Sequence, residues 1–545
     1  MKLVKSLLLG SAAGLTVVAG AHAADLPVKK AVPVEYVKVC TAHGAGFFYI
    51  PGTDTCLRIS GRARFQATYL QNYFRGNNGN AGDLMGYQGL GRFAFDARTS
   101  TAYGTLRSFI RFDLAYGTGP FLASGTQTRQ GGNILAFGVD GYGRAVTNVN
   151  IDKAFIQFAG FTAGRASSFF DFYAHDFEMI GGTLGSDLPS TNLLAYTATF
   201  GNGFSATLSV EDPALRRTPL FGSASSNSIV ASSQFALITG GSNFSPVLSS
   251  LNGVPVGVAE YDVSQRSRMP DFVGALRYDS AWGSAQLSAA VHELNAGLAN
   301  GGTRLFGGGT STFASAPHPS SEYGWAIQAG LKVNTPFIAP GDTLYLQGAY
   351  GEGAQRYVGF SSWNGSYLAN SNVAAGATLN NWYADAVLDP LTGKLDLSKS
   401  WSVVASFLHY WTPQWRSAVF GSYGEQSFGR ASRVNVGLLT APVTSFLNPI
   451  NAAYGFNGVL RDTNQLVAGG SLIWSPVRDL DIGVEGVYTR AALQSGRTID
   501  LNKAAGQVAT GVNAAGQPIN AAGIALPTTN ATDTFQVRMR VQRDF

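Results

Sequence analysis

The sequence is poor in charge and has no long apolar run, and each shortage excludes a class of protein. Only 13% of its 545 residues are charged, about half the usual share in soluble domains. The formal charge of +5 is too small to indicate a nucleic-acid partner. After the first residues, no stretch approaches the roughly 18 apolar residues of a transmembrane helix. The chain is nevertheless 45% hydrophobic, so its apolar side chains must be buried or face lipid in a structure other than a transmembrane helix.

The amino terminus is typical of an exported protein. Lys2 and Lys5 precede an apolar run, 7–20, and Ala21-His22-Ala23 matches a signal-peptidase site. About 14 apolar residues are too few to span a membrane. We therefore expect residues 1–23 to be a signal peptide that is cleaved after Ala23.

Cysteine is nearly absent, and its only two copies, Cys40 and Cys56, lie in the exported part. A single pair in an oxidising compartment most simply forms a disulfide. A metal site is the alternative, but it needs more ligands than the nearby His43 can supply. We expect the disulfide, just before the first strand.

The most informative pattern is the ending, residues 534–545, in which polar and apolar side chains alternate up to a final Phe545. A strict period of two indicates a strand with one apolar and one polar face. Its length suits a tilted transmembrane strand of about 9–11 residues. Such a strand with an aromatic carboxyl terminus is typical of an outer-membrane barrel, in which it closes the sheet against the first strand.

Similar segments recur along the chain and predict sixteen strands. We place them near 57–69, 89–98, 104–116, 149–159, 161–167, 192–200, 203–211, 271–279, 283–293, 323–333, 342–352, 401–410, 414–424, 466–475, 480–490 and 533–545. Short connections marked by Gly, Pro, Asn or Asp alternate with long ones. That alternation is typical of short periplasmic turns and long external loops. A soluble β-sandwich, the alternative, rarely carries so many long loops.

The predicted fold class is therefore all-β: a transmembrane, sixteen-stranded, antiparallel up-and-down β-barrel. Residues 24–56 would form a periplasmic segment that contains the disulfide, and residues 57–545 the barrel. The long loops, especially 221–254 and 503–533, are rich in Gly, Ser, Ala and Asn. We expect them to be solvated rather than to form inserted domains.

Strand phase predicts which charges face the lumen, because a charge facing lipid at mid-depth costs about 2–4 kcal/mol. Nine arginines on four neighbouring strands fall in the polar phase and would form a basic wall: Arg58, Arg62, Arg64, Arg92, Arg98, Arg107, Arg111, Arg538 and Arg540. The alternative is an ordinary polar lumen without a functional cluster.

The connection 166–190 carries acids among many aromatic residues. The acids are Asp171, Asp176, Glu178 and Asp187. Folded into the lumen, this loop would narrow the pore and oppose acids to arginines, and such a field sorts permeants by size and charge. An exposed loop is the alternative.

Two stretches near the amino terminus, ADLPVKKAVPVEYVKVC and GAGFFYIPGTDTCLRISG, together with the final Phe, resemble the general diffusion porins of rhizobial and related alphaproteobacteria. The resemblance implies a multi-pass barrel in the bacterial outer membrane, assembled as a homotrimer. It also implies that 166–190 forms the constriction and that Phe545 belongs to the signal for the outer-membrane insertion machinery.

We therefore expect an outer-membrane porin: a passive, water-filled channel for small hydrophilic solutes and ions, in contact with outer-membrane lipid and without a cofactor or metal. A substrate-specific channel is the alternative. An enzyme is not expected, since the histidines are scattered and no nucleophile–base pair can be placed. The sequence leaves anion or cation selectivity open, because the wall favours anions and the loop acids favour cations.

Overall fold

The computed structural model describes residues 38–70, 85–118, 145–217, 220, 244–297, 302–360, 384–440, 456, 460–500, 503–504, 507 and 509–545, without 174, 188, 189, 264 and 307. The expected signal peptide, 1–23, lies outside the described residues. Two compact units divide between Leu57 and Arg58.

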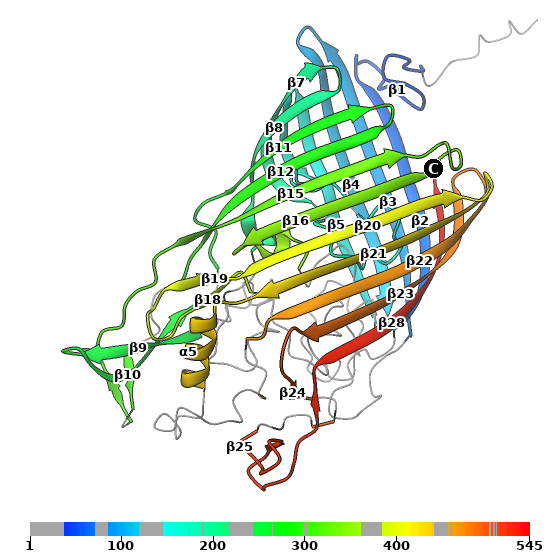
Figure 1. Ribbon diagram of the computed structural model, residues 1–545. Coiled ribbons are helices and arrows are strands. Elements are labelled where there is room, and N and C mark those ends of the chain that lie inside the picture. Colours follow the sequence, from blue (N-terminus) through cyan, green and yellow to red (C-terminus); the bar gives the residue numbers. More distant parts are fainter. Residues whose placement is uncertain are drawn as a thin grey trace, which may run out of the picture. The chain divides into compact units, whose positions relative to one another are not determined.

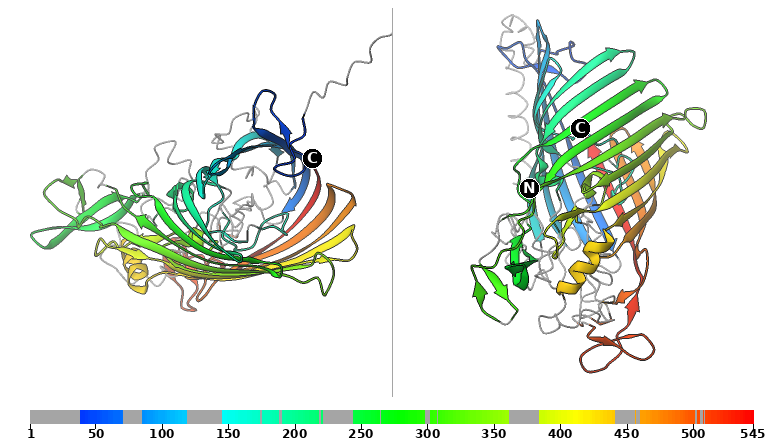
Figure 2. Two further views of the ribbon diagram at one scale, coloured as in Figure 1. Left: turned by 90° about the horizontal axis from the view of Figure 1, so that it is seen from above. Right: turned by 60° about the vertical axis from the view of Figure 1, so that its left-hand side comes forward.

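The second unit is a closed antiparallel barrel (Figure 1). Its strands are β2 (Cys56–Leu70), β3 (Met85–Thr101), β4 (Gly104–Thr118), β5 (Ala145–Phe158), β6 (Phe161–Ala166), β7 (Thr191–Gly201), β8 (Phe204–Glu211), β11 (Asp271–Ser280), β12 (Gly283–Leu294), β15 (Glu322–Asn334), β16 (Thr343–Glu352), β20 (Lys399–Tyr410), β21 (Trp415–Ser427), β22 (Thr463–Val477), β23 (Leu480–Leu493) and β28 (Ala531–Asp544). Each pairs with the next one named, and β28 pairs with β2. The views in Figure 2 show these strands curving around a lumen.

The prediction of sixteen strands is confirmed, and every predicted segment overlaps a strand of the barrel. The strands at 85–101 and 463–477 start earlier than predicted. Alternating hydrophobicity identifies only the part of a strand that faces lipid, whereas backbone hydrogen bonding continues beyond the bilayer. Short connections behave as their residues predict: Asn202 and Gly203, between β7 and β8, have φ of 51° and 87°. That pair of positive angles suits the two-residue turn of a hairpin.

The barrel is apolar outside and polar inside. In β20 the exposed residues alternate with buried ones, so that Val403 is 48% exposed while the side chains of Ser402 and Ser406 are buried. This arrangement is the reverse of a soluble protein, and it places the apolar face toward lipid. No helix among the described residues is long and apolar enough to cross a membrane.

The final strand closes the barrel against the first one. Arg62 of β2 lies opposite Asp544 of β28. At the end of this seam, the backbone of Phe545 exchanges two hydrogen bonds with Gly61, at 3.0 and 2.8 Å. A Cβ at Gly61 would lie 2.4 Å from the Phe545 ring, so only glycine leaves room for the terminal aromatic side chain.

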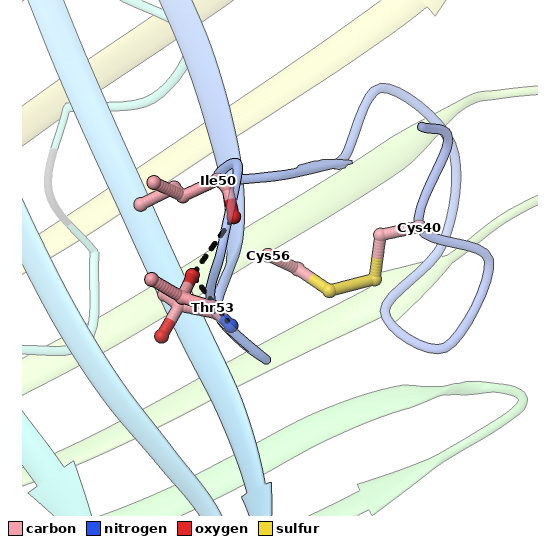
Figure 3. Close-up of a disulfide and its surroundings, with 5 residues drawn as sticks. Cys40, Ile50, Thr53 and Cys56 are labelled. Carbon is pink, nitrogen blue, oxygen red and sulfur yellow. Dashed lines mark hydrogen bonds between the residues drawn. A yellow bond between two sulfur atoms is a disulfide. The ribbon is translucent and has the colours of Figure 1, made fainter. Parts of the chain in front are cut away.

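The first unit contains the predicted disulfide. Cys40 and Cys56 are bonded, with Cα atoms 6.0 Å apart, and the prediction is confirmed (Figure 3). Both sulfurs are buried against Phe47. The two-residue strand β1 (Phe48–Tyr49) pairs with the start of β2, and the Thr53 hydroxyl donates to the Ile50 carbonyl at 3.0 Å.

The long connections contain more regular structure than expected. One small sheet has the order β14 (Thr310–Ser311), β13 (Thr303–Leu305), β10 (Val254–Asp262) and β9 (Phe244–Leu251). Shorter elements are η2 (Pro213–Leu215), η3 (Gln355–Tyr357), β18 (Ala386–Leu388), β19 (Leu395–Leu397), α5 (Arg430–Thr440), β24 (Thr498–Ile499), β25 (Gly511–Val512), β26 (Pro518–Ile519) and β27 (Thr528–Thr529). Val247 and Tyr261, from the connection between β8 and β11, share one apolar cluster with Leu388, from the connection between β16 and β20. The cluster joins separate connections, so the composition of each loop did not predict it.

Candidate functional site in the barrel lumen

Residues 167–190, called the inner segment here, connect β6 to β7 and bind inward-facing side chains of distant strands. The carbonyl of Phe170 accepts a hydrogen bond from Ser288 of β12 at 2.7 Å. The backbone N–H of Tyr173 donates to Gln347 of β16 at 3.0 Å. The inner segment therefore runs inside the barrel, in contact with β12 and β16.

Met179 and Ile180, near the middle of the inner segment, are attached to β23 and β28. Glu485 of β23 accepts the backbone N–H groups of Met179 and Ile180, both at 2.7 Å. On β28, Arg538 donates to the Met179 carbonyl at 3.0 Å, and Arg540 donates to the same oxygen. Charge-assisted hydrogen bonds of this kind are about twice as strong as neutral ones.

Two strand glycines make room for this attachment. A Cβ at Gly330 of β15 would lie 2.2 Å from the Phe172 ring, and one at Gly483 of β23 would lie 2.4 Å from the Met179 side chain. A larger residue at Gly330 would displace the Phe172 ring, and one at Gly483 would displace the end of the Met179 side chain. Glycine at these two positions therefore leaves space on the inner surface of the barrel for the side chains of Phe172 and Met179.

Glu178 organises the middle of the inner segment. Its carboxylate accepts hydrogen bonds from the Tyr173 hydroxyl at 2.9 Å and from Thr183, and it lies 3.2 Å from Nδ1 of His175. Burial by itself would lower the pKa of His175, but the attraction and hydrogen bond of Glu178 outweigh it and raise this pKa to about 9. Burial acts to raise the pKa of Glu178, and the His175 charge outweighs it and holds this pKa below its usual range. At neutral pH the two side chains form a buried ion pair.

Five arginines of the predicted basic wall bind carboxylates, and three of them do so between neighbouring strands at the cavity. The pairs are Arg62 with Asp544 at 2.6 Å, Arg92 with Asp113 at 2.7 Å, and Arg111 with Asp152. Each pair joins adjacent strands, so much of the positive charge expected on this wall is locally compensated.

Arg64 and Arg540 differ from those three because their acceptors are neutral. Arg64 donates to the side-chain oxygen of Gln542 at 2.8 and 2.6 Å. Arg540 donates to the side-chain oxygen of Gln66 at 3.0 and 2.8 Å. Both guanidinium groups line the same cavity.

The remaining members of the predicted wall lie elsewhere. Arg98 and Arg107 both bind Asp96, at 2.8 and 3.0 Å. Arg58 is exposed near the start of β2. None of these three arginines is among the residues that line the cavity.

The four predicted acids of the inner segment have different surroundings, and all but Asp171 line the cavity. Asp171 is bound by Arg216, which follows η2, at 2.6 Å, and the side chain of Glu178 is fully buried as described above. Asp176 and Asp187 line the cavity, and Asp176 accepts the hydroxyl of Tyr345 at 3.0 Å. Burial raises the pKa of Asp187 to about 6.

The cavity between the inner segment and the wall measures about 860 Å³. Six of the nine predicted arginines line it, namely Arg62, Arg64, Arg92, Arg111, Arg538 and Arg540. Asp176, Glu178 and Asp187 border it from the inner segment. The structure thus brings charges of both signs to one water-accessible space.

Sequence analysis did not identify several charged residues that also line this cavity, among them Asp152, Lys153, Arg416 and Asp481. Strict alternation would send Asp152 and Lys153 to opposite faces of β5. The register shifts between these residues and β4, so that Lys153 lies opposite Arg111 and Ile151 opposite Phe112. A β-bulge of this kind turns two consecutive side chains to one face. In the sequence, the two consecutive charged residues Asp152 and Lys153 were the signal that could have indicated this bulge.

A closed antiparallel barrel with an apolar outer face and a charged, water-accessible interior is the architecture of an outer-membrane channel. Residues 25–514 match the family described as Porin subfamily, and the chain therefore belongs to this porin family. It is an outer-membrane porin.

Porins of Brucella are similar to this chain. Porin Omp2b of Brucella suis is 31% identical over 355 residues, which cover 60% of this chain and 80% of the relative. Porin Omp2b of Brucella neotomae is 31% identical over 376 residues, covering 64% and 84%. The outer membrane channel DcaP of Acinetobacter baumannii aligns with 91% of this chain and 99% of its own, at a TM-score of 0.48 and 12% identity. The matches to Brucella porins confirm the predicted resemblance to alphaproteobacterial porins.

Proposed function

We propose that the chain forms a passive channel for small hydrophilic solutes and ions, in which the inner segment narrows the pore and sets acids opposite a basic wall. It would catalyse no reaction. The observation that carries this proposal is the attachment of Met179 to Glu485 and Arg538 across the lumen. This attachment supports a fixed constriction, since four hydrogen bonds to charged groups of β23 and β28 end on two adjacent residues.

The charges around the cavity support weak selectivity rather than exclusion. Arg64 and Arg540 lie on the β2–β28 side, and Asp176 and Asp187 lie on the inner segment. Separated charges at a narrow wet passage create a transverse field, which orients dipolar solutes and slows ions of either sign. Because most wall arginines are paired with carboxylates, no strong preference for one sign is expected.

Reversal potentials in a salt gradient test the charge arrangement. Asp176→Asn should shift the selectivity toward anions, and Arg64→Gln should shift it toward cations, each by about two- to fourfold, because one screened charge is typically worth about 0.2–1 kcal/mol. Arg107→Gln, which removes the same charge outside the cavity lining, is the control and should change little. Unchanged reversal potentials in both test variants would contradict the proposal.

Neutral solutes distinguish a general pore from a substrate-specific one. In liposome-swelling measurements, sugars of increasing size should enter at rates that fall smoothly with their size. A single neutral sugar that enters much faster than smaller ones, with a saturating rate, would instead support the substrate-specific alternative.

We also propose that the chain is exported by cleavage after Ala23, inserted by machinery that recognises Phe545, and assembled as a homotrimer. Family membership supports the trimer, and the pairing of Phe545 with Gly61 supports a role of the terminus in closing the barrel. Cross-linking of the protein in outer membranes tests the oligomer. Replacement of Phe545 by Ala should lower the amount of folded protein in the membrane.

A further inference from the structure

We propose that Arg64 and Arg540 form a binding subsite for small oxyanions, such as carboxylates and phosphate, on the wall of the pore. The inference rests on the proposed function, because it requires that solutes pass through the cavity. It adds a class of preferred solute that the general-pore proposal does not specify.

The two guanidinium groups are diagonal neighbours on adjacent strands. Arg64 lies opposite Gln542, and Arg540 lies opposite Gln66, two residues further along each strand. Diagonal neighbours of this kind are about 7–8 Å apart, within reach of long side chains. Each guanidinium uses Nε and Nη2 for its hydrogen bonds, and neither Nη1 bonds to any described residue. The Nη1 groups of Arg64 and Arg540 can therefore donate hydrogen bonds to a solute in the cavity.

Carboxylates near this pair are engaged by other groups. Asp544 binds Arg62 at 2.6 Å, and Asp481 binds Arg416 at 2.7 Å. Glu485 accepts two backbone N–H groups of the inner segment. Two adjacent positive charges in a partly buried site repel one another, and an anion between them would offset this repulsion.

The shape of the donors selects the kind of anion. The Nε–Nη2 edge of each guanidinium is bound to a glutamine, so the two Nη1 groups would donate to two different oxygens of one carboxylate or phosphate. A halide offers a single centre to the two donors, and a neutral sugar gains nothing from the charge. The subsite would thus slow oxyanions while neutral solutes pass according to size.

Single-channel recording with the full-length protein tests this proposal. Potassium acetate, succinate or phosphate is added to a potassium chloride solution at constant ionic strength. Each oxyanion should reduce the chloride current in a saturable way, and potassium bromide should not. Comparison of the three salts identifies which oxyanion source is held best. An equal effect of bromide on the wild-type channel would overturn the proposal without any variant.

Charge-conserving variants separate the subsite from the general field. The double variant Arg64→Lys, Arg540→Lys keeps both charges but loses both guanidinium groups. Its conductance in potassium chloride alone is recorded first, because Arg540 also donates to the Met179 carbonyl. Its half-blocking concentration of oxyanion should rise by about tenfold, because hydrogen bonds to charged groups are involved. The control is Arg107→Lys, which should block as the wild type does.

The outcomes separate this inference from the proposed function. Unchanged oxyanion block in the double lysine variant would overturn the subsite and leave the proposed pore intact. Failure of the proposed function would instead appear as unchanged reversal potentials in Asp176→Asn and Arg64→Gln.

Discussion

The carboxylate of Glu485 accepts the backbone N–H of Met179 at 2.7 Å, across 306 positions of the sequence. A second oxygen of the same carboxylate accepts the N–H of Ile180 at 2.7 Å. Through this relationship a strand of the barrel determines where the inner segment crosses the lumen. The width of the pore should therefore depend on Glu485, a buried residue of the barrel wall.

Glu485→Gln should loosen the inner segment and raise single-channel conductance and current noise. The amide has one acceptor oxygen and would leave one backbone N–H without its charged partner, a loss of about 1.5–3 kcal/mol. Conductance in potassium chloride is the measurement. Glu425→Gln on β21, a glutamate that accepts the Tyr423 hydroxyl instead, is the control. A variant with wild-type conductance and noise would show that Glu485 does not position the segment.

Gly330→Ala should displace Phe172, because the new Cβ would lie 2.2 Å from its ring. Overpacking of this kind typically costs about 1–3 kcal/mol. We expect faster proteolysis of the inner segment in detergent solution and an altered conductance. Gly89→Ala on β3, where a Cβ meets nothing within 4 Å, is the matched control. Combining Gly330→Ala with Phe172→Ala should restore resistance to protease, and failure of this rescue would contradict the steric account.

Acidification should shift ion selectivity toward anions with a midpoint near pH 6. Burial raises the pKa of Asp187 to about 6, with Asp171 and Asp176 adding repulsion while His175 and Arg216 oppose the shift. Below this pH the carboxyl group is neutral, so the inner segment loses one negative charge beside the cavity. Reversal potentials between pH 7.5 and 5 measure the change. Asp187→Asn should remove the step, and a step that persists in this variant must come from another group.

Alkaline pH should weaken the packing of the inner segment. The folded-state pKa of His175 is raised from 6.5 to about 9. The stability that this protonated histidine contributes is complete below about pH 6.5 and is lost as pH rises through about 9. Amide hydrogen exchange within the segment, corrected for the intrinsic effect of pH, should become faster between pH 7 and 10. In His175→Gln the corrected exchange should be fast at both pH values, and an identical pH dependence in wild type and variant would refute the assignment to His175.

The fold was predictable because each barrel strand carries its own local pattern. Alternation with period two, short turns such as Asn202-Gly203 and the closing strand with Phe545 all follow from nearby residues. The small sheet formed by the loops was not predictable in this way, because β9 and β10 come from one connection and β13 and β14 come from another.

The candidate site was only partly predictable. Strand phase located the arginines, but it could not show that Arg62 is compensated by Asp544 while Arg64 has a neutral acceptor. Composition located the acids of the inner segment, but it could not show that Arg216, from a different connection, binds Asp171. These pairings depend on contacts between residues far apart in the sequence.

By itself the sequence determined the class of protein, since many alternating strands joined by short and long connections in turn are typical of a barrel with lipid outside and water inside. Strand phase also predicted a set of inward-facing arginines, because exposing a charge to lipid is costly, and six of those nine line the cavity. Only the tertiary structure decided which of those charges remain available to solutes. Register, the bulge at Asp152 and the seating of Met179 on Glu485 bring distant groups within hydrogen-bonding distance, and these short-range interactions determine where charge is neutralised.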